Sequence, residues 1–345
     1  MRFHCTIAIV TWSSVFAVAC TSSALPSDAS EDVAGATSGL ASSNGLSLNG
    51  VQMNGVQMNG VQMNGVQMNG ISLNGLSLNG VEIHGAELKA IRADNGETMR
   101  GTALLGATMQ AVLSDGREIL LEVNDIQQST TPDVYLYTIK HWTGDAWDDL
   151  CRVEGGQPTR AIPLRGRWDY SSGTPTGGDF IDDPDIFTFA CLDGALAKCV
   201  GLGYEPWKTK SECHQGSCQD VELRPLHQAC TRLLRGDYCG DGTTHTTNGT
   251  LVNLWDPLNI QVSANLGSGW ASEAEWGAEG ALCIATTRHE SQAASDYVDA
   301  HCRERKTAAF SCFGSMSTFG AAMGFTTPLS ERSLLRNEFQ LDDED

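Results

Sequence analysis

Apolar residues are spaced in three different ways along the chain. Between residues 46 and 90 they recur two positions apart inside a five-residue unit. From residue 91 to about 153, longer segments alternate apolar and polar residues, which is typical of half-buried strands. After Cys191 the spacing becomes helical. The pattern predicts an α+β protein whose N-terminal half is antiparallel β and whose later part contains short helices.

The strand predictions centre on one hairpin. Segments 102–113 and 117–123 flank a Ser-Asp-Gly sequence, which is a good turn signal between strands. Residues 133–142 alternate in the same way, and a Thr-Gly-Asp turn follows them. These segments predict an antiparallel sheet of about four strands. Strand character continues at 164–170 and 187–191.

Helical spacing marks four later segments. Segment 194–200 is rich in Ala, and 221–235 places Leu and Cys near a helical period. Two more short helices are predicted at 272–276 and 295–303. We expect one hydrophobic core, followed by an exposed acidic tail over 321–345.

The five-residue unit is a sequence repeat. Val-Gln-Met-Asn-Gly occurs four times from residue 51 to 70, and nine related units cover 46–90. In an extended unit the apolar residues share one side, and the Gly permits a corner. This resembles the pentapeptide-repeat β-solenoid, which implies a short solenoid before the globular part.

Two other interpretations of the repeat stay open. One is a poorly ordered spacer between the tether and the globular part. The other is self-association, because uncharged alternating segments with Gln and Asn readily form intermolecular β-structure. No Asp, Glu, Lys or Arg occurs from Val33 to Val81.

The N-terminus predicts export. Arg2 precedes a mostly apolar stretch, and Ala17-Val18-Ala19 provides the small residues of a signal-peptide cleavage site, so the signal peptide is assigned to 1–19. A Cys directly afterwards resembles a bacterial lipobox, which implies that Cys20 is acylated and anchors the protein, with the outer membrane favoured. The alternative is an ordinary signal peptide cut at Ala19 or slightly later. Residues 20–45 are rich in Ser, Ala and Gly and predict a flexible tether.

The charge balance excludes two classes of partner. The 345 residues include 22 Lys and Arg against 42 Asp and Glu, a formal net charge of -20. Binding to nucleic acid needs clustered basic residues to neutralise phosphates. The same acidity disfavours electrostatic docking on anionic lipid. We therefore expect no nucleic-acid partner, and membrane attachment only through the lipid anchor.

The cysteine count also favours an oxidising compartment. Cleavage of the leader removes Cys5, and acylation occupies Cys20. Ten cysteines then remain, an even number that could close five disulfides in any pairing. These disulfide candidates all lie between residues 151 and 312: Cys151, Cys191, Cys199, Cys213, Cys218, Cys230, Cys239, Cys283, Cys302 and Cys312.

One loop holds the candidate catalytic residues. They are Asp237, Cys239, Asp241 and His245. A Cys near a His and a carboxylate could act as a nucleophile with a base, which gives a thiol-dependent extracytoplasmic hydrolase or transferase as an alternative function. That chemistry needs a free thiolate. The even cysteine count in an exported chain favours a structural disulfide instead.

Two further groups of residues are candidate metal ligands. The zinc candidates are Cys213, His214 and Cys218, with His227 and Cys230. The calcium candidates are Asp179, Asp182, Asp183 and Asp185. Neither group has the spacing of a standard site, so we expect no metal and no cofactor.

Several motifs between residues 189 and 242 resemble the ADYC domain. They are Phe189-Ala-Cys191, Gly194-Ala-Leu-Ala-Lys-Cys199, Gly203-Tyr204-Glu-Pro206-Trp207 and the block from Cys230 to Gly242. Gly236-Asp-Tyr-Cys239 matches the Ala-Asp-Tyr-Cys motif of that family, with Gly in place of Ala. The likeness runs over roughly 85–312 and implies a cysteine-rich globular domain, assigned to 91–320.

The resemblance also sets the functional expectation. The family is typical of myxobacterial envelope proteins, and it implies no catalytic residue. We therefore expect an exported, lipid-anchored envelope protein that acts as a non-enzymatic binding or structural module, with an envelope or surface protein as its partner.

Overall fold

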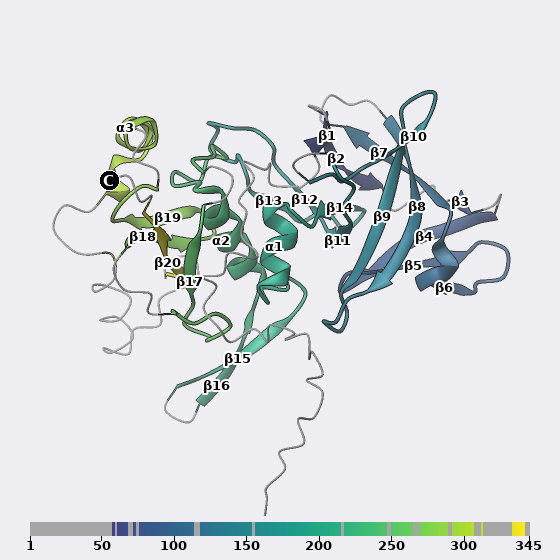
Figure 1. Ribbon diagram of the computed structural model, residues 1–345. Coiled ribbons are helices and arrows are strands. Elements are labelled where there is room, and N and C mark those ends of the chain that lie inside the picture. The colour runs from purple at the N-terminus through teal and green to yellow at the C-terminus, as the bar shows by residue number, and fades with distance from the viewer. Residues whose placement is uncertain are drawn as a thin grey trace, which may run out of the picture. The chain divides into compact units, whose positions relative to one another are not determined.

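The computed structural model describes residues 57–58, 61–67, 72–73, 76–113, 118–153, 156–214, 217–246, 250–264, 269–288, 292–306, 312 and 333–341 (Figure 1). These residues form mostly antiparallel β-structure with three short α-helices, joined by five disulfides. The predicted signal peptide 1–19, the acylation site Cys20 and the tether 20–45 lie outside the described residues.

The largest sheet has 12 strands. Its strands are β1 (Gln57–Met58), β2 (Val61–Gln67), β3 (Ser72–Leu73), β4 (Leu76–His84), β5 (Glu87–Arg92), β6 (Thr98–Arg100), β7 (Ala107–Leu113), β8 (Glu118–Gln128), β9 (Tyr135–Trp142), β10 (Trp147–Asp149), β11 (Ala161–Arg165) and β14 (Ile186–Cys191). A short 3-10 helix, η1 (Gly101–Leu104), connects β6 to β7. The predicted hairpin is confirmed, since β7 pairs with β8 in antiparallel register.

Six of these strands close on one another. A continuous antiparallel path runs from β7 through β8, β9 and β11 to β14. Strand β2 pairs with β14 on one side and with β7 on the other. The repeat therefore supplies the strand that completes a closed ring.

The predicted solenoid is wrong for the described part of the repeat. Strands β2 and β4 run through the glycines at Gly65 and Gly80 instead of turning there, and the pairing register shifts beside both. Glycine suits such bulges because it has no side chain to clash. Val and Leu at the first inward position are bulky for a solenoid interior, and antiparallel neighbours satisfy the backbone hydrogen bonds directly.

One glycine of the repeat does turn the chain. Gly85 has a φ of 65° between β4 and β5, and a Cβ there would lie 2.8 Å from the carbonyl oxygen of Asp133. From this point the alternation is visible in burial, because Val81, Leu88 and Ala90 are buried while Glu82 is exposed. Period-two patterning therefore predicts this end of the repeat correctly.

The rest of the chain combines two hairpins, three helices and a second sheet. Its elements are β12 (Arg167–Trp168), β13 (Phe180–Ile181), α1 (Ala195–Gly201), β15 (Thr209–His214), β16 (Ser217–Glu222), α2 (Arg224–Arg235), β17 (Val252–Trp255), β18 (Trp270–Gly277), β19 (Gly280–Ile284), α3 (Gln292–His301), η2 (Arg303–Arg305) and β20 (Leu335–Gln340). The second sheet has the order β17-β20-β18-β19. Helices predicted at 194–200, 221–235 and 295–303 correspond to α1, α2 and α3.

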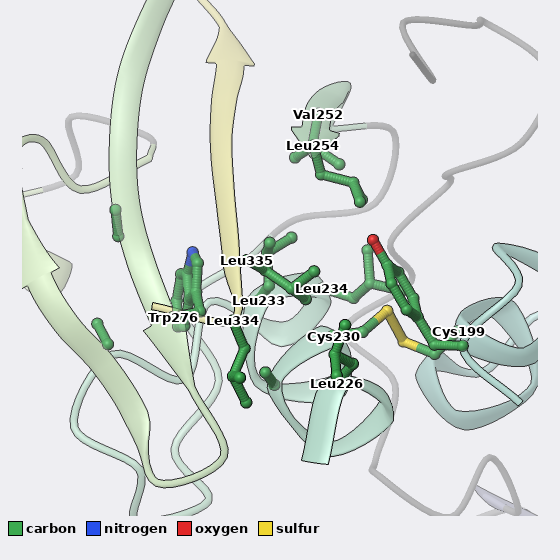
Figure 2. Close-up of a cluster of buried hydrophobic side chains, with 14 of the residues drawn as sticks. Cys199, Leu226, Cys230, Leu233, Leu234, Val252, Leu254, Trp276, Leu334 and Leu335 are labelled. Carbon is green, nitrogen blue, oxygen red and sulfur yellow. A yellow bond between two sulfur atoms is a disulfide. The ribbon is translucent and has the colours of Figure 1, made fainter. Parts of the chain in front are cut away.

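Helix α2 has clear boundary signals. Pro225 occupies its first turn, where a missing N–H costs nothing. Arg232 and Arg235 lie in the last turn, where positive charge complements the helix dipole. Its apolar residues pack against the second sheet, as Figure 2 shows for Leu233 and Leu234 beside Trp276 and Leu335.

Two predictions in this part are wrong. Residues 272–276, predicted as a helix, lie in β18, which pairs with β20 and β19. The tail predicted as exposed over 321–345 contains β20, in which Leu335, Asn337 and Phe339 are buried. These residues alternate with more exposed ones, as expected of a strand with one covered face. The acidic residues at 342–345 obscured that alternation in the sequence.

The buried apolar residues form three clusters instead of the single core expected. One lies on the large sheet and includes Leu121 and Phe189. Another surrounds α2 and the second sheet, and the third gathers around Trp168 and α1. Among the described residues, no helix combines the length and the apolar composition needed to cross a membrane.

Candidate functional site

The Gly-Asp-Tyr-Cys motif begins where α2 ends. Gly236 is the C-cap of the helix, with φ 61° and ψ 34°, a left-handed conformation that glycine adopts most readily. A Cβ at this position would lie 2.8 Å from the carbonyl oxygen of His245. This packing leaves no room for a side chain at Gly236.

The Asp237 side chain is fully buried, and its carboxylate interacts with other groups of the protein. Its carboxylate pairs with the guanidinium of Arg232, and Arg235 lies 3.6 Å away. It also accepts hydrogen bonds from the backbone N–H groups of Asp241 and Gly242, both at 3.1 Å. Asp237 thus ties the last turn of α2 to the loop that follows.

Arg232 extends this network to a second loop. Its guanidinium donates to the carbonyl oxygen of Gly177 at 2.6 Å and pairs with Asp179. Asp179, one of the calcium candidates, is therefore held by an arginine. The desolvation cost of a buried ion pair is offset only when each charged group also has hydrogen-bond partners.

Tyr238 points into the second sheet. Its ring stacks on Trp276 with a centroid separation of 5.4 Å, and its hydroxyl donates to Oε1 of Glu273 at 2.9 Å. The same hydroxyl oxygen accepts the backbone N–H of Arg288 at 2.7 Å. Burial raises the pKa of Tyr238 well above its ordinary value, so the phenol remains a neutral donor.

Glu273 and Arg288 form a second buried ion pair, and both side chains are 0% exposed. Nε of Arg288 donates to Oε1 of Glu273 at 2.8 Å, and Nη2 donates to Oε2 at 2.9 Å. Burial opposes the charge on Arg288, but the adjacent Glu273 carboxylate raises its pKa overall. Asn337 of β20 donates to Glu273 as well, and accepts the indole N–H of Trp276 at 2.8 Å.

Arg288 also completes the end of α2. Its Nη2 donates to the carbonyl oxygen of Leu233 at 2.8 Å, and Nη1 lies 3.4 Å from that of Leu234. Carbonyls in the last turn of a helix have no partner within the helix. One arginine therefore joins the helix end, the motif tyrosine and strand β18.

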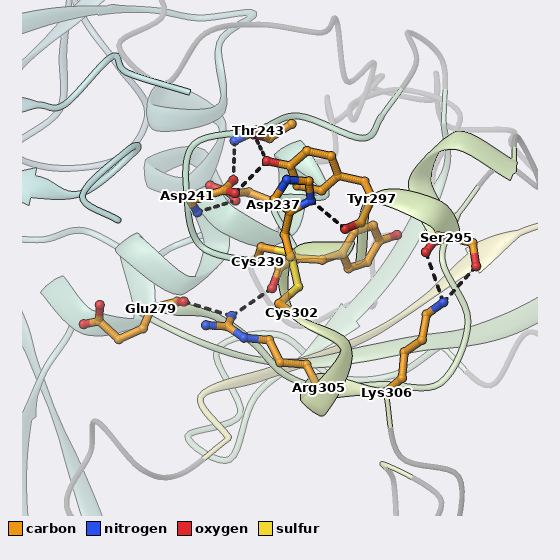
Figure 3. The surroundings of a disulfide bond; sticks show 12 residues. Asp237, Cys239, Asp241, Thr243, Glu279, Ser295, Tyr297, Cys302, Arg305 and Lys306 are labelled. Atoms are coloured by element: carbon orange, nitrogen blue, oxygen red, sulfur yellow. Dashed lines mark hydrogen bonds between the residues drawn. A yellow bond between two sulfur atoms is a disulfide. The ribbon is translucent and has the colours of Figure 1, made fainter. Parts of the chain in front are cut away.

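Cys239 is bonded to Cys302, which follows α3 (Figure 3). Next to this disulfide, Arg305 donates to the carbonyl oxygen of Tyr238 at 2.8 Å. The thiolate that the candidate nucleophile requires is consumed by the disulfide. The alternative of a Cys239-centred catalytic group is therefore not supported by the bonding of its sulfur.

Asp241 and His245 lie on the same loop but are not connected to each other. The hydroxyl of Tyr297 donates to Asp241 at 2.7 Å (Figure 3). Burial acts to raise the pKa of Asp241, but hydrogen bonds from Tyr297 and Thr243 lower it overall. Within the described residues, no hydrogen bond joins His245 to Asp237 or Asp241.

His245 instead lies among aromatic rings. Its ring centroid is 5.9 Å from that of Tyr238 and 4.8 Å from that of Tyr297. Burial lowers its pKa, which favours the neutral imidazole. The four sequence-predicted residues are brought into one loop, but all four serve packing and internal bonding, and the base and nucleophile roles are not assembled.

All ten predicted disulfide candidates are paired. The bridges are Cys151–Cys191, Cys199–Cys230, Cys213–Cys218, Cys239–Cys302 and Cys283–Cys312. The zinc candidates therefore lack their thiolates. His227 lies 3.0 Å from the carbonyl oxygen of Leu196, and burial lowers its pKa to about 4. No group of three or more metal-binding side chains occurs in the described part of the chain.

Sequence reasoning missed Glu273, Arg288 and Asn337. The helix predicted at 272–276 gives no sign that Glu273 is buried, whereas in strand β18 its side chain lies on a buried face. Asn337 was assigned to an exposed tail. Only the long-range pairing of β18 with β20 brings these residues together.

The disulfides are expected to differ in their contribution to stability. Replacing Cys239 and Cys302 by Ala should lower the free energy of unfolding by about 2 kcal/mol more than the same change at Cys213 and Cys218, because the closed loops span 63 and 5 residues. Urea unfolding of both double variants measures the difference. Equal losses would contradict the chain-entropy account.

Comparisons with known proteins give one match. The family model described as ADYC domain matches residues 101–290. No curated protein and no solved structure matches the chain significantly. The matched region covers more than half of the chain and includes the motif loop, both buried ion pairs and α2, and on this basis the protein belongs to the ADYC domain family.

Proposed function

We propose that this protein is an exported, lipid-anchored module of the bacterial cell envelope that binds a partner or contributes to envelope structure without catalysing a reaction. The observation that carries this proposal is how the motif residues are used. Asp237, Tyr238 and Cys239 are all engaged in internal bonds, to Arg232, Glu273 and Cys302 respectively. Side chains with these partners are suited to scaffolding.

The disulfides support the location. Five disulfides indicate an oxidising, extracytoplasmic compartment, because thiols are kept reduced in the cytoplasm. They constrain the part of the chain from Cys151 to Cys312. A domain that must persist outside the cell benefits from this covalent constraint.

The anchor is the finer part of the proposal. Acylation of Cys20 with two or more chains would hold the protein on a membrane stably, since each buried methylene contributes about 0.8 kcal/mol. The tether over 20–45 would then separate the anchor from the folded domain. The outer membrane is the expected site, because Thr21 follows the Cys where a retention signal would have Asp.

A peptide map without reduction tests the scaffold. In protein isolated from its native host, we expect five cross-linked peptide pairs and no thiol that reacts with an alkylating reagent before unfolding. An alkylatable Cys239 in the native protein would contradict the non-enzymatic proposal.

The anchor is tested separately by metabolic labelling with a fatty acid. The wild-type protein is expected to carry the label and to sediment with membranes, whereas a Cys20→Ser variant should lose both properties. An unlabelled wild type that is released by washing would contradict the anchor and leave the scaffold proposal intact.

A further inference from the structure

Strand β2, which completes the ring of six strands, lies between two strands that are distant from it in the chain. Strands β7, β8, β9, β11 and β14 already form a continuous path without it. No hairpin connects β2 to either of its ring neighbours, because β3 to β6 precede β7 in the chain and β14 follows much later. β2 therefore occupies a position between two strands that do not depend on it for their other pairings.

The pairings of β2 are made by the backbone on both sides. Against β7 the partners are Met63 with Leu113, Gly65 with Val112, and Val66 with Ala111. Against β14 they are Val66 with Phe187 and Gln67 with Ile186. Backbone hydrogen bonds give affinity in such strand addition, and the side-chain pattern sets the register.

The sequence of β2 is present more than once in the chain. Val-Gln-Met-Asn-Gly-Val-Gln at 61–67 also occurs at 51–57 and at 56–62. A one-residue slip of a strand normally moves every side chain to the wrong face. A shift of five residues in this repeat restores the same residue at every position, so the replacement strand makes identical pairings.

A second molecule carries the same strand. No charged residue occurs from Val33 to Val81, so electrostatic repulsion does not oppose the approach of two repeats. Exchange of identical elements between copies is a low-cost route to association, because both molecules keep the same contacts. At low concentration the chain's own strand wins through its higher effective concentration.

From these observations we propose that the position between β7 and β14 is an acceptor site for one Val-Gln-Met-Asn-Gly-Val-Gln strand, and that a second copy of this chain fills it by strand exchange. The partner is thus the same protein, and the exchanged element is a single strand of the repeat. This inference does not depend on the proposed anchor or on the absence of catalysis.

Engineered cysteine pairs test the exchange in the full mature chain carrying Cys20→Ser. Gln67→Cys with Ile186→Cys places two thiols at positions that are directly opposite each other in the paired strands β2 and β14. In one chain this pair should cross-link internally. Two differently tagged chains, one with Gln67→Cys and one with Ile186→Cys, are mixed in urea with their native disulfides intact, refolded together and mildly oxidised. We expect a cross-linked heterodimer whose fraction rises at least several-fold over a tenfold increase in concentration.

Two further pairs make the result specific. Gln57→Cys with Ile186→Cys in one chain should also cross-link, since Gln57 takes the place of Gln67 after a ten-residue shift. Leu73→Cys with Ala107→Cys joins β3 to β7, outside the four Val-Gln-Met-Asn-Gly units. This pair should cross-link within one chain, but its yield between chains should be at least tenfold lower than that of the β2 pair. If Ile186→Cys perturbs folding, Val66→Cys with Ala111→Cys reports the opposite side of β2.

Each outcome decides the proposal. Internal cross-links without any heterodimer at all concentrations would overturn exchange between copies. Equal heterodimer yields for the β2 and β3 pairs would indicate exchange of a larger segment and would overturn the single-strand site. Failure of both β2 pairs to cross-link within one folded chain would overturn the acceptor site itself.

Discussion

Replacing Arg288 by Met is expected to lower the free energy of unfolding by about 3–5 kcal/mol. The change leaves the Glu273 carboxylate at 0% exposure without its charged partner. It also removes one of the donors to the carbonyl oxygen of Leu233 at the end of α2. Urea unfolding followed by tryptophan fluorescence measures the loss, because Trp276 lies within the same network.

Two controls separate the ion pair from the loss of any arginine. Arg303→Met removes an exposed guanidinium from η2 and should change stability by at most about 0.5 kcal/mol. The double variant Glu273→Gln with Arg288→Met should be more stable than Arg288→Met alone, since it leaves no unpaired buried charge. If the double variant is the less stable of the two, the account of an unpaired carboxylate is wrong.

Asp237→Ala is expected to be comparably destabilising, by about 3–5 kcal/mol. It removes one of the two carboxylates that pair with the buried Arg232 and frees the N–H groups of Asp241 and Gly242. Asp237→Asn should lose less, because the amide oxygen can still accept a backbone hydrogen bond. The same unfolding measurement, with the native disulfides intact, compares the two variants.

Asp185→Ala provides the matched control for this position. Asp185 is exposed, and its replacement should have a small effect. A loss below about 1 kcal/mol for Asp237→Ala would show that the buried network does not depend on this carboxylate. The motif aspartate would then need another explanation than scaffolding.

The sequence predicts local features of this fold well. The hairpin of β7 and β8, strand β9 and helix α2 each follow from a pattern contained within their own residues. Predictions that depended on distant partners were wrong. The repeat has the alternation of a strand in either a solenoid or an antiparallel sheet, and only its pairing with β7 and β14 distinguishes the two.

The motif loop shows the same division between local and distant information. Its four predicted residues do lie together, because they are close in sequence. Their roles come from residues that no spacing rule connects to them, namely Glu273, Arg288 and Cys302. An even cysteine count favoured a disulfide at Cys239 but could not identify Cys302 as its partner.

The position of β20 has a consequence for when the domain can fold. This strand is synthesised after β17, β18 and β19, yet it lies between β17 and β18. The second sheet therefore cannot be completed until residue 340 has left the ribosome, and until then Glu273 lacks the amide of Asn337. The large sheet has all of its strands by residue 191, so the two sheets can be completed at different times during synthesis.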